Sequence, residues 1–95
     1  MELAGKIAVI TGVSKGIGFE LASQLLEKGC KVYGLGRNSN PALMHSSFQF
    51  IETDVRQVAS VKKAFAQIYE QQEEIHILVN NAGLGYFGFL ENMSD

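Results

Sequence analysis

Residues 7–18 read Ile-Ala-Val-Ile-Thr-Gly-Val-Ser-Lys-Gly-Ile-Gly, and this stretch decides the fold. Ile7–Ile10 is a short apolar run rich in β-branched residues, which predicts a strand buried on both faces. A glycine-rich turn follows, and after it apolar residues recur at helical spacing as far as Lys28 and Gly29. A strand, a glycine turn and a helix in this order bring backbone N–H groups and a helix N-terminus together, where a phosphate can bind. We therefore predict a nucleotide site.

The glycines of this turn have different expected roles. Gly12 permits the tight turn, Gly16 lets a pyrophosphate approach closely, and Gly18 lets the helix pack against the strand. The spacing of these glycines differs from the G-x-G-x-x-G fingerprint of dinucleotide-binding folds. The turn also lacks the G-K-S/T ending of a P-loop. A glycine turn can also be a plain connection between a strand and a helix, so the interpretation depends on other stretches.

Length and composition predict one modest globular domain. The chain has 95 residues, 46 % of them hydrophobic, and a single proline. Its formal net charge of −2 gives no basis for binding nucleic acid or an anionic membrane. The one cysteine, Cys30, excludes an internal disulfide and fits a reducing cytoplasm, where we expect the protein. Met1–Lys6 lacks the apolar segment of a signal peptide, and no run approaches the length of a membrane span.

The rest of the chain alternates strands and helices. Strands are predicted at Cys30–Gly36, Ser47–Glu52 and Ile75–Val79, and an amphipathic helix at 58–71. The connection between the second and third strands has no room for a crossover helix, so we expect a compact loop, in which Leu43 and Met44 could make one helical turn. Such alternation predicts an α/β fold with a parallel sheet, strand order 3-2-1-4 and one helix on each face.

Four polar or glycine-rich stretches fall at the carboxyl edge of this predicted sheet, where ligands bind in such folds. They are the glycine turn, Gly36-Arg37, Asp54-Val55 and Asn80–Gly83. Arg37 stands where dinucleotide folds usually place a carboxylate for the ribose hydroxyls. An arginine there can bind a 2′-phosphate, which a carboxylate would repel. The alternative for Arg37 is an exposed arginine after a strand.

These residues resemble the short-chain dehydrogenase/reductase family. Residues 11–18 match its T-G-x-x-x-G-I-G cofactor motif, Asp54-Val55 matches its adenine-contact pair, and residues 80–83 match its N-N-A-G motif. The likeness covers essentially the whole chain in the right order and spacing. It implies a Rossmann-like doubly wound parallel sheet that is incomplete, because residues 1–95 correspond to the N-terminal part of a single dinucleotide-binding domain before its catalytic half.

The resemblance implies a role in binding NADP(H) for each matched position. The glycine turn would hold the pyrophosphate, the Asp54 side chain and the Val55 backbone would contact the adenine, and the N-N-A-G motif would pack on the ribose and reach the turn through Thr11. Lys15 and Arg37 match two basic positions that mark members preferring NADP(H). The implied cofactor-binding residues are Gly12, Ser14, Lys15, Gly16, Ile17, Gly18, Arg37, Asp54, Val55, Asn81, Ala82 and Gly83. Asp54 could instead begin the next helix, and Lys15 could be a solvated charge.

The catalytic Tyr-x-x-x-Lys pair of the family is absent from these 95 residues. The residues four positions after the tyrosines Tyr33, Tyr69 and Tyr86 are Arg37, Glu73 and Leu90. His45 and His76 are interpreted as a loop residue and a strand-entry residue, and no metal site or catalytic residue is assigned. Residues 93–95 resemble the start of a further helix.

We therefore expect an NADP(H)-dependent oxidoreductase that transfers a hydride between the cofactor and a small carbonyl or alcohol substrate when full length. The 95-residue chain alone is expected to be inactive, and the protein to be a homo-oligomer. The alternative is a non-catalytic, nucleotide-binding or self-associating fragment. A sugar epimerase is disfavoured by the glycine spacing and by N-N-A-G.

Overall fold

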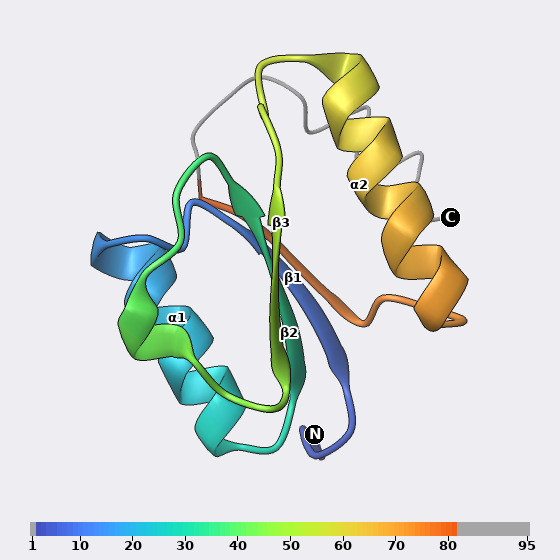
Figure 1. Cartoon of the computed structure of the whole chain (residues 1–95). Coiled ribbons are helices and arrows are strands. Elements are labelled where there is room, and N and C mark those ends of the chain that lie inside the picture. Colours follow the sequence, from blue (N-terminus) through green and yellow to red (C-terminus); the bar gives the residue numbers. More distant parts are fainter. Residues whose placement is uncertain (1, 82–95) are drawn as a thin grey trace.

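The computed structural model describes residues 2–81. Strands and helices alternate along the chain, as predicted (Figure 1). In chain order the elements are β1 (Ile7–Thr11), α1 (Gly16–Glu27), β2 (Lys31–Gly36), the 3-10 helix η1 (Pro41–Leu43), β3 (Phe48–Glu52), α2 (Val58–Gln71) and β4 (Ile77–Asn80).

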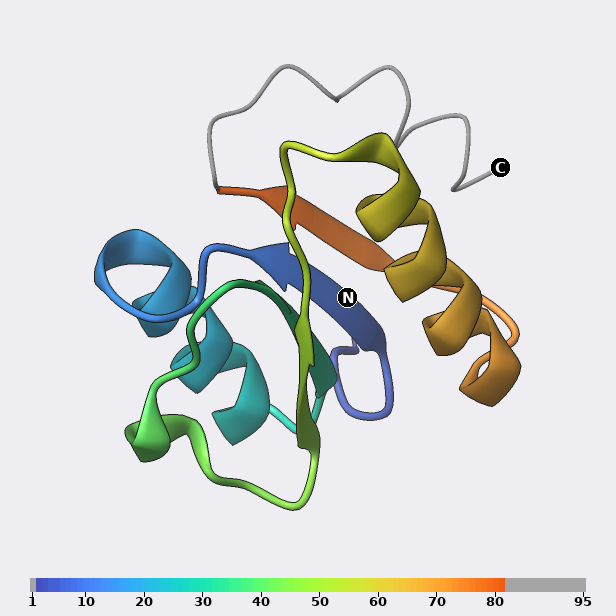
Figure 2. The ribbon, with the colours of Figure 1, turned by 45° about the horizontal axis from the view of Figure 1, so that its top comes forward.

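All strand pairs in the sheet are parallel, in the order β3-β2-β1-β4. The predicted fold class and strand order are therefore confirmed. Figure 2 shows α1 and η1 on one face of the sheet and α2 on the other, so the prediction of one helix on each face is also correct. The chain reverses its direction of progress across the sheet between β1 and β4, which places the switch point beside the end of β1.

Two hydrophobic clusters hold the layers together, one on each side of β1. Because side chains alternate along a strand, Ile7 and Val9 face α2 whereas Ala8 and Ile10 face α1, and all four are buried. The buried residues of α2 recur at three- and four-residue steps and belong to the first cluster; they are Val61, Ala64, Phe65 and Ile68. Burial of β1 on both faces explains why its sequence is a continuous apolar run rather than an alternating one.

The observed β4 begins two residues later than the sequence predicts and ends one residue later. The predicted start at residue 75, taken from the apolar run 75–79, is wrong because the pairing of β4 with β1 begins only at Ala8 and Ile77. His76 N–H donates to the Ile7 carbonyl over 2.9 Å, and the Ile7 N–H donates to Nδ1 of the His76 ring, also over 2.9 Å, instead of to a strand carbonyl. His76 is thus a strand-entry residue, as predicted.

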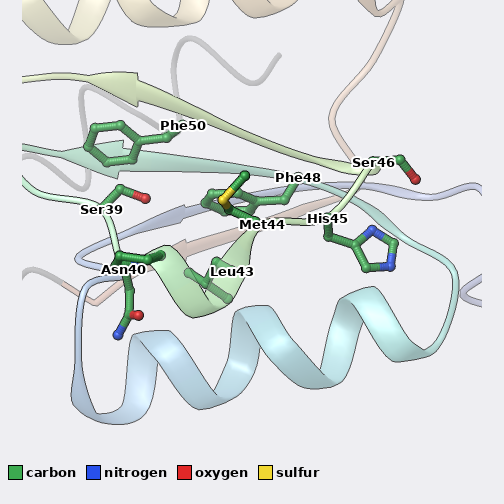
Figure 3. A pocket seen from close by; sticks show the side chains of 9 residues that line it. Ser39, Asn40, Leu43, Met44, His45, Ser46, Phe48 and Phe50 are labelled. Atoms are coloured by element: carbon green, nitrogen blue, oxygen red, sulfur yellow. The ribbon is translucent and has the colours of Figure 1, made fainter.

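The connection between β2 and β3, residues 37–47, is a compact loop, as predicted. Its one helical turn is η1, which includes Leu43 but ends before Met44. Because this turn covers less of the sheet than a helix would, Phe48 and Phe50 remain only partly buried. A shallow groove of about 710 Å³ lies here (Figure 3). Its lining residues are Ser39, Asn40, Pro41, Leu43, Met44, His45, Ser46, Phe48 and Phe50.

Cys30, directly before β2, is buried and reduced, and its Sγ donates to the carbonyl of Leu3 over 3.3 Å. It packs among apolar residues of the cluster on the α1 side of the sheet, as expected from the sequence. Within residues 2–81, no helix combines the length and the apolar character needed to cross a membrane.

Candidate nucleotide-binding site

The glycine turn joins β1 to α1 in a conformation that suits glycine. Gly12 has φ +72° and Gly16 has φ +67°, a region that other residues rarely adopt. A Cβ atom built on Gly16 would meet no atom within 4 Å, so the space beside Gly16 is open. A Cβ on Gly18 would instead collide with the carbonyl oxygen of Gly12 and lie 2.7 Å from Nδ2 of Asn81. Gly16 therefore leaves room for a ligand, whereas Gly18 lets α1 pack against the turn.

Backbone donors of this turn are available to an anion. Within residues 2–81, the N–H groups of Val13, Ser14 and Lys15 have no hydrogen-bond partner. The next residue, Gly16, begins α1, whose first turn contains no acidic side chain and whose N-cap residue Lys15 makes no capping hydrogen bond. Orphan donors and the positive end of the helix dipole then coincide, which is the arrangement that binds phosphate groups.

The end of β4 is tied to the glycine turn. The hydroxyl of Thr11 donates to Oδ1 of Asn80 over 3.1 Å, which is the link through Thr11 that the resemblance implied. Nδ2 of Asn81 also donates to the carbonyl of Gly12 over 3.0 Å, and the Gly12 N–H donates to the carbonyl of Leu35 in β2 over the same distance. The turn is thus held between its two neighbouring strands at the switch point.

A small pocket of about 260 Å³ lies beside the turn, at the ends of β2 and β3. It is lined by Gly12, Leu35, Gly36, Arg37, Thr53, Asp54, Val55 and Arg56. The predicted arginine, the predicted Asp-Val pair and the first glycine of the turn therefore line one pocket, although they are far apart in the sequence.

The sequence shows no acid beside Arg37, but the fold brings one there. Nη2 of Arg37 lies 4.0 Å from Oδ2 of Asp54, because β2 and β3 are neighbours in the sheet. The Arg37 side chain is 57 % exposed, and exposed pairs at such separations contribute little to stability, so Arg37 remains able to bind an anion.

Asp54 has a closer partner in Arg56. Its Oδ1 accepts from Nε of Arg56 over 3.1 Å and from the Arg56 backbone N–H over 3.0 Å, and its Oδ2 accepts from Nη2 over 3.3 Å. Asp54 does not begin the next helix: α2 begins at Val58 with Gln57 as its N-cap. The Asp54 N–H does reach forward to Oγ of Ser60 over 2.9 Å, which holds the carboxylate at the pocket.

The other predicted residues lie at the rim of the turn or outside the described part of the chain. Ser14 is half-buried, Lys15 is exposed, and Ile17 is 72 % exposed at the first turn of α1. Ala82, Gly83 and the predicted start of a helix at 93–95 lie outside the described residues.

Sequence reasoning missed two residues of this region, Arg56 and Asn40. Nδ2 of Asn40 donates to the carbonyl of Ser14 over 2.9 Å. The pair Asn40-Pro41 is a local signal for a helical turn, since asparagine favours the N-cap and proline the first helical position. Nothing in the local sequence signals the contact with Ser14, which lies 26 residues earlier.

Comparison with known proteins agrees with this geometry. The family model described as short chain dehydrogenase matches residues 6–95. The probable short-chain type dehydrogenase/reductase VdlC of Helicobacter pylori is 39 % identical over 88 residues, covering 90 % of this chain and 32 % of that protein. The 3-oxoacyl-(acyl-carrier-protein) reductase FabG of Escherichia coli K12 is 35 % identical over 100 residues, covering 100 % of this chain and 41 % of that protein.

Solved structures show the same relationship. A short chain dehydrogenase from Leptospira borgpetersenii, crystallised with bound NAD+, superposes with a TM-score of 0.76 at 28 % identity, covering 83 % of this chain and 32 % of that one. The ligand-free aldohexose dehydrogenase of Thermoplasma acidophilum superposes with a TM-score of 0.74 at 26 % identity, covering 95 % of this chain and 37 % of that one. The chain spans from about a quarter to two fifths of the length of the curated relatives it matches. By its sequence, its sheet and its glycine turn, the chain belongs to the short-chain dehydrogenase family of oxidoreductases.

Proposed function

We propose that this chain supplies the NADP(H)-binding part of an oxidoreductase that acts on a small carbonyl or alcohol. In this proposal residues 1–95 form the N-terminal part of a single dinucleotide-binding domain. The observation that carries the proposal is the glycine turn. Its three N–H donors have no partner among residues 2–81, they precede a helix whose N-cap side chain makes no hydrogen bond, and Gly16 leaves open space. A dinucleotide pyrophosphate fits this donor set, which would replace its hydration with fixed hydrogen bonds.

The proposed roles follow from the placement of the residues. The turn from Gly12 to Gly18, with Ser14, Lys15 and Ile17 at its rim, would bind the pyrophosphate. The pocket between the ends of β2 and β3 would take the adenosine, with Asp54 and Val55 at the adenine. Asn81, Ala82 and Gly83 complete the proposed binding set next to the ribose. The cofactor would supply the hydride to a carbonyl or accept it from an alcohol, and this chain's own residues would bind and orient the cofactor.

The preference for NADP(H) over NAD(H) rests on Arg37 and Lys15. Arg37 lines the adenosine pocket, is more than half exposed, and is drawn only weakly toward Asp54 at 4.0 Å. A guanidinium in this position can bind a 2′-phosphate with two parallel hydrogen bonds. The Leptospira relative was crystallised with NAD+, so the preference has to be measured for this chain.

The test is a titration of this chain with NADP+ and NAD+ by calorimetry. Wild type is expected to bind NADP+ about ten- to a hundredfold more tightly, because hydrogen bonds between charged groups contribute roughly 1.5–3 kcal/mol. Arg37→Ala should remove this difference and leave NAD+ binding unchanged. Lys62→Ala removes a charge from α2 instead and serves as a control. Equal affinities of wild type for both dinucleotides would refute the preference.

We propose that the 95-residue chain alone does not transfer hydride, because its sequence lacks the Tyr-x-x-x-Lys pair that moves the substrate proton in this family. The second candidate function is a nucleotide-binding fragment without catalysis. Oxidation of NADPH by the purified chain with a carbonyl substrate would exclude that candidate.

The proposal also includes a cytoplasmic location and homo-oligomeric assembly. The location is supported by the reduced, buried Cys30, which suits a reducing compartment. Assembly is supported by β4, which within residues 2–81 is an edge strand without a charged side chain.

A further inference from the structure

The glycine turn is held at three consecutive residues by three different parts of the molecule. Asn81 binds the carbonyl of Gly12, as described above. Val13 is fully buried against β2, where a Cβ on Gly34 would lie 2.7 Å from Cγ2 of Val13. Among residues 2–81, Ser14 receives its hydrogen bond from Asn40, which belongs to the connection between β2 and β3. The first restraint comes from the residue directly after β4 and the second from β2, but the third comes from the loop between β2 and β3.

The side chain of Asn40 is fixed at both of its polar ends. Its Oδ1 accepts from the Ala42 N–H over 2.9 Å and so caps η1, while its Nδ2 donates to Ser14 over 2.9 Å. Figure 3 shows Asn40 at the base of η1, pointing toward the start of α1. The 3-10 helix is itself anchored, because Leu43 is 2 % exposed and packs in the cluster on the α1 side of the sheet.

Holding the Ser14 carbonyl also orients a donor. The structure contains no cis peptide among its described residues, and in a trans peptide the C=O and the following N–H point in opposite directions. The Ser14 carbonyl is directed at Asn40, so the Lys15 N–H is directed away from Asn40. Lys15 N–H is one of the three donors of the turn that have no partner within residues 2–81.

We propose that Asn40 is a positioning residue for the phosphate site: it orients the Ser14–Lys15 peptide, and thereby the Lys15 N–H, without touching the nucleotide. This inference rests on the proposed function, since it takes the turn as the pyrophosphate site. The role proposed for Asn40 predicts a different effect on the two dinucleotides from the role proposed for Arg37. A pyrophosphate is common to both dinucleotides, so loss of the Asn40 contact weakens NADP+ and NAD+ by the same factor, whereas Arg37→Ala affects NADP+ alone.

The variant that isolates this contact is Asn40→Ser. Serine is also a good N-cap, so it can still accept from the Ala42 N–H, but its side chain is too short to place a donor on the Ser14 carbonyl. The substitution introduces no charge. Ser39→Ala, in the exposed neighbouring residue of the same loop, is the matched control.

Two measurements on the 95-residue chain test the proposal, both at a temperature where circular dichroism shows all variants folded. Calorimetry is expected to show that Asn40→Ser lowers the affinity for both NADP+ and NAD+ by about five- to tenfold. This factor corresponds to the net contribution of one hydrogen bond. Amide hydrogen exchange without nucleotide is expected to be faster at Lys15 than in wild type. Ser39→Ala should behave as wild type in both.

The outcomes separate the two proposals. Unchanged exchange at Lys15, unchanged affinities, or a loss confined to one dinucleotide in Asn40→Ser would overturn the role of Asn40. If wild type binds neither dinucleotide, the proposed function fails, and with it the effect on affinity; exchange at Lys15 then decides by itself whether Asn40 orients the peptide.

Discussion

At the scale of single residues, two glycines of the turn have different roles: Gly16 leaves space for a ligand, whereas Gly18 allows close packing of α1. Gly16→Ala places a methyl group in open space, so its expected cost is only that of a positive φ, about 1–2 kcal/mol. The methyl group stands where the pyrophosphate is proposed to bind, so nucleotide affinity should fall by at least about tenfold, equivalent to roughly 1.4 kcal/mol. Chemical denaturation and calorimetry measure the two effects.

Gly5 supplies a matched control for this substitution. It too has a positive φ, +80°, and a Cβ there would meet nothing within 4 Å, but it lies before β1 and bonds to Gly29. Gly5→Ala should therefore cost about as much stability as Gly16→Ala and leave nucleotide binding intact. Equal losses of affinity in both variants would mean that the methyl group at Gly16 does not act at a binding site.

Gly18→Ala is expected to act through the fold instead. Its Cβ would collide with the Gly12 carbonyl, a backbone atom that cannot move without displacing the turn. Overpacking of this kind typically costs about 1–3 kcal/mol, and here the end of β1 and the start of α1 must separate. The midpoint of urea unfolding should therefore fall below that of wild type. A variant as stable as wild type would show that the turn and α1 are not in such close contact.

At the scale of elements, His76 joins the start of β4 to the start of β1. Its Nδ1 accepts from the buried Ile7 N–H, so His76→Ala leaves that donor without a partner, at a cost of about 1–3 kcal/mol. His76→Asn can keep an acceptor near the position of Nδ1 and should recover most of the loss. Urea denaturation of the three proteins measures the difference.

His45 is the control for this prediction. Its Nδ1 also accepts from a backbone N–H, that of Ser47 over 3.0 Å, but the contact is exposed and local. Water can replace it, so His45→Ala should change the free energy of unfolding by less than about 0.5 kcal/mol. If both alanine variants lose the same stability, the contact between His76 and Ile7 has no special role.

Local sequence patterns predict the helices and strands well, but they do not predict the contacts between these elements. The apolar run of β1 and the apolar stripe of α2 are each visible within one short stretch of sequence. Both elements can therefore be predicted from the pattern of hydrophobic residues. The start of β4 does not, because the register with β1 and a histidine side chain determine it. For the same reason the sequence places Arg37 at the site but does not show its approach to Asp54, nor the contact between Asn40 and Ser14.

At the scale of the whole molecule, the direction of the backbone donors in β4 makes the proposed assembly testable. The His76 N–H points to β1, as its bond to Ile7 shows. Because donors alternate in direction along a strand, the N–H of Leu78 also points to β1, whereas those of Ile77 and Val79 point to the outer edge. Within residues 2–81 no strand pairs with that edge. An edge of this kind is a template for pairing with another chain.

We therefore expect amide exchange at Ile77 and Val79 to depend on protein concentration. In dilute samples both amides should exchange faster than that of Leu78, which serves as an internal reference in the same strand. At concentrations where sedimentation detects association, both should become protected while Leu78 stays unchanged, because a second copy supplies acceptors that residues 2–81 do not. Protection of Ile77 and Val79 in a dilute monomer would show instead that the chain covers this edge itself, and homo-oligomeric pairing through β4 would then be wrong.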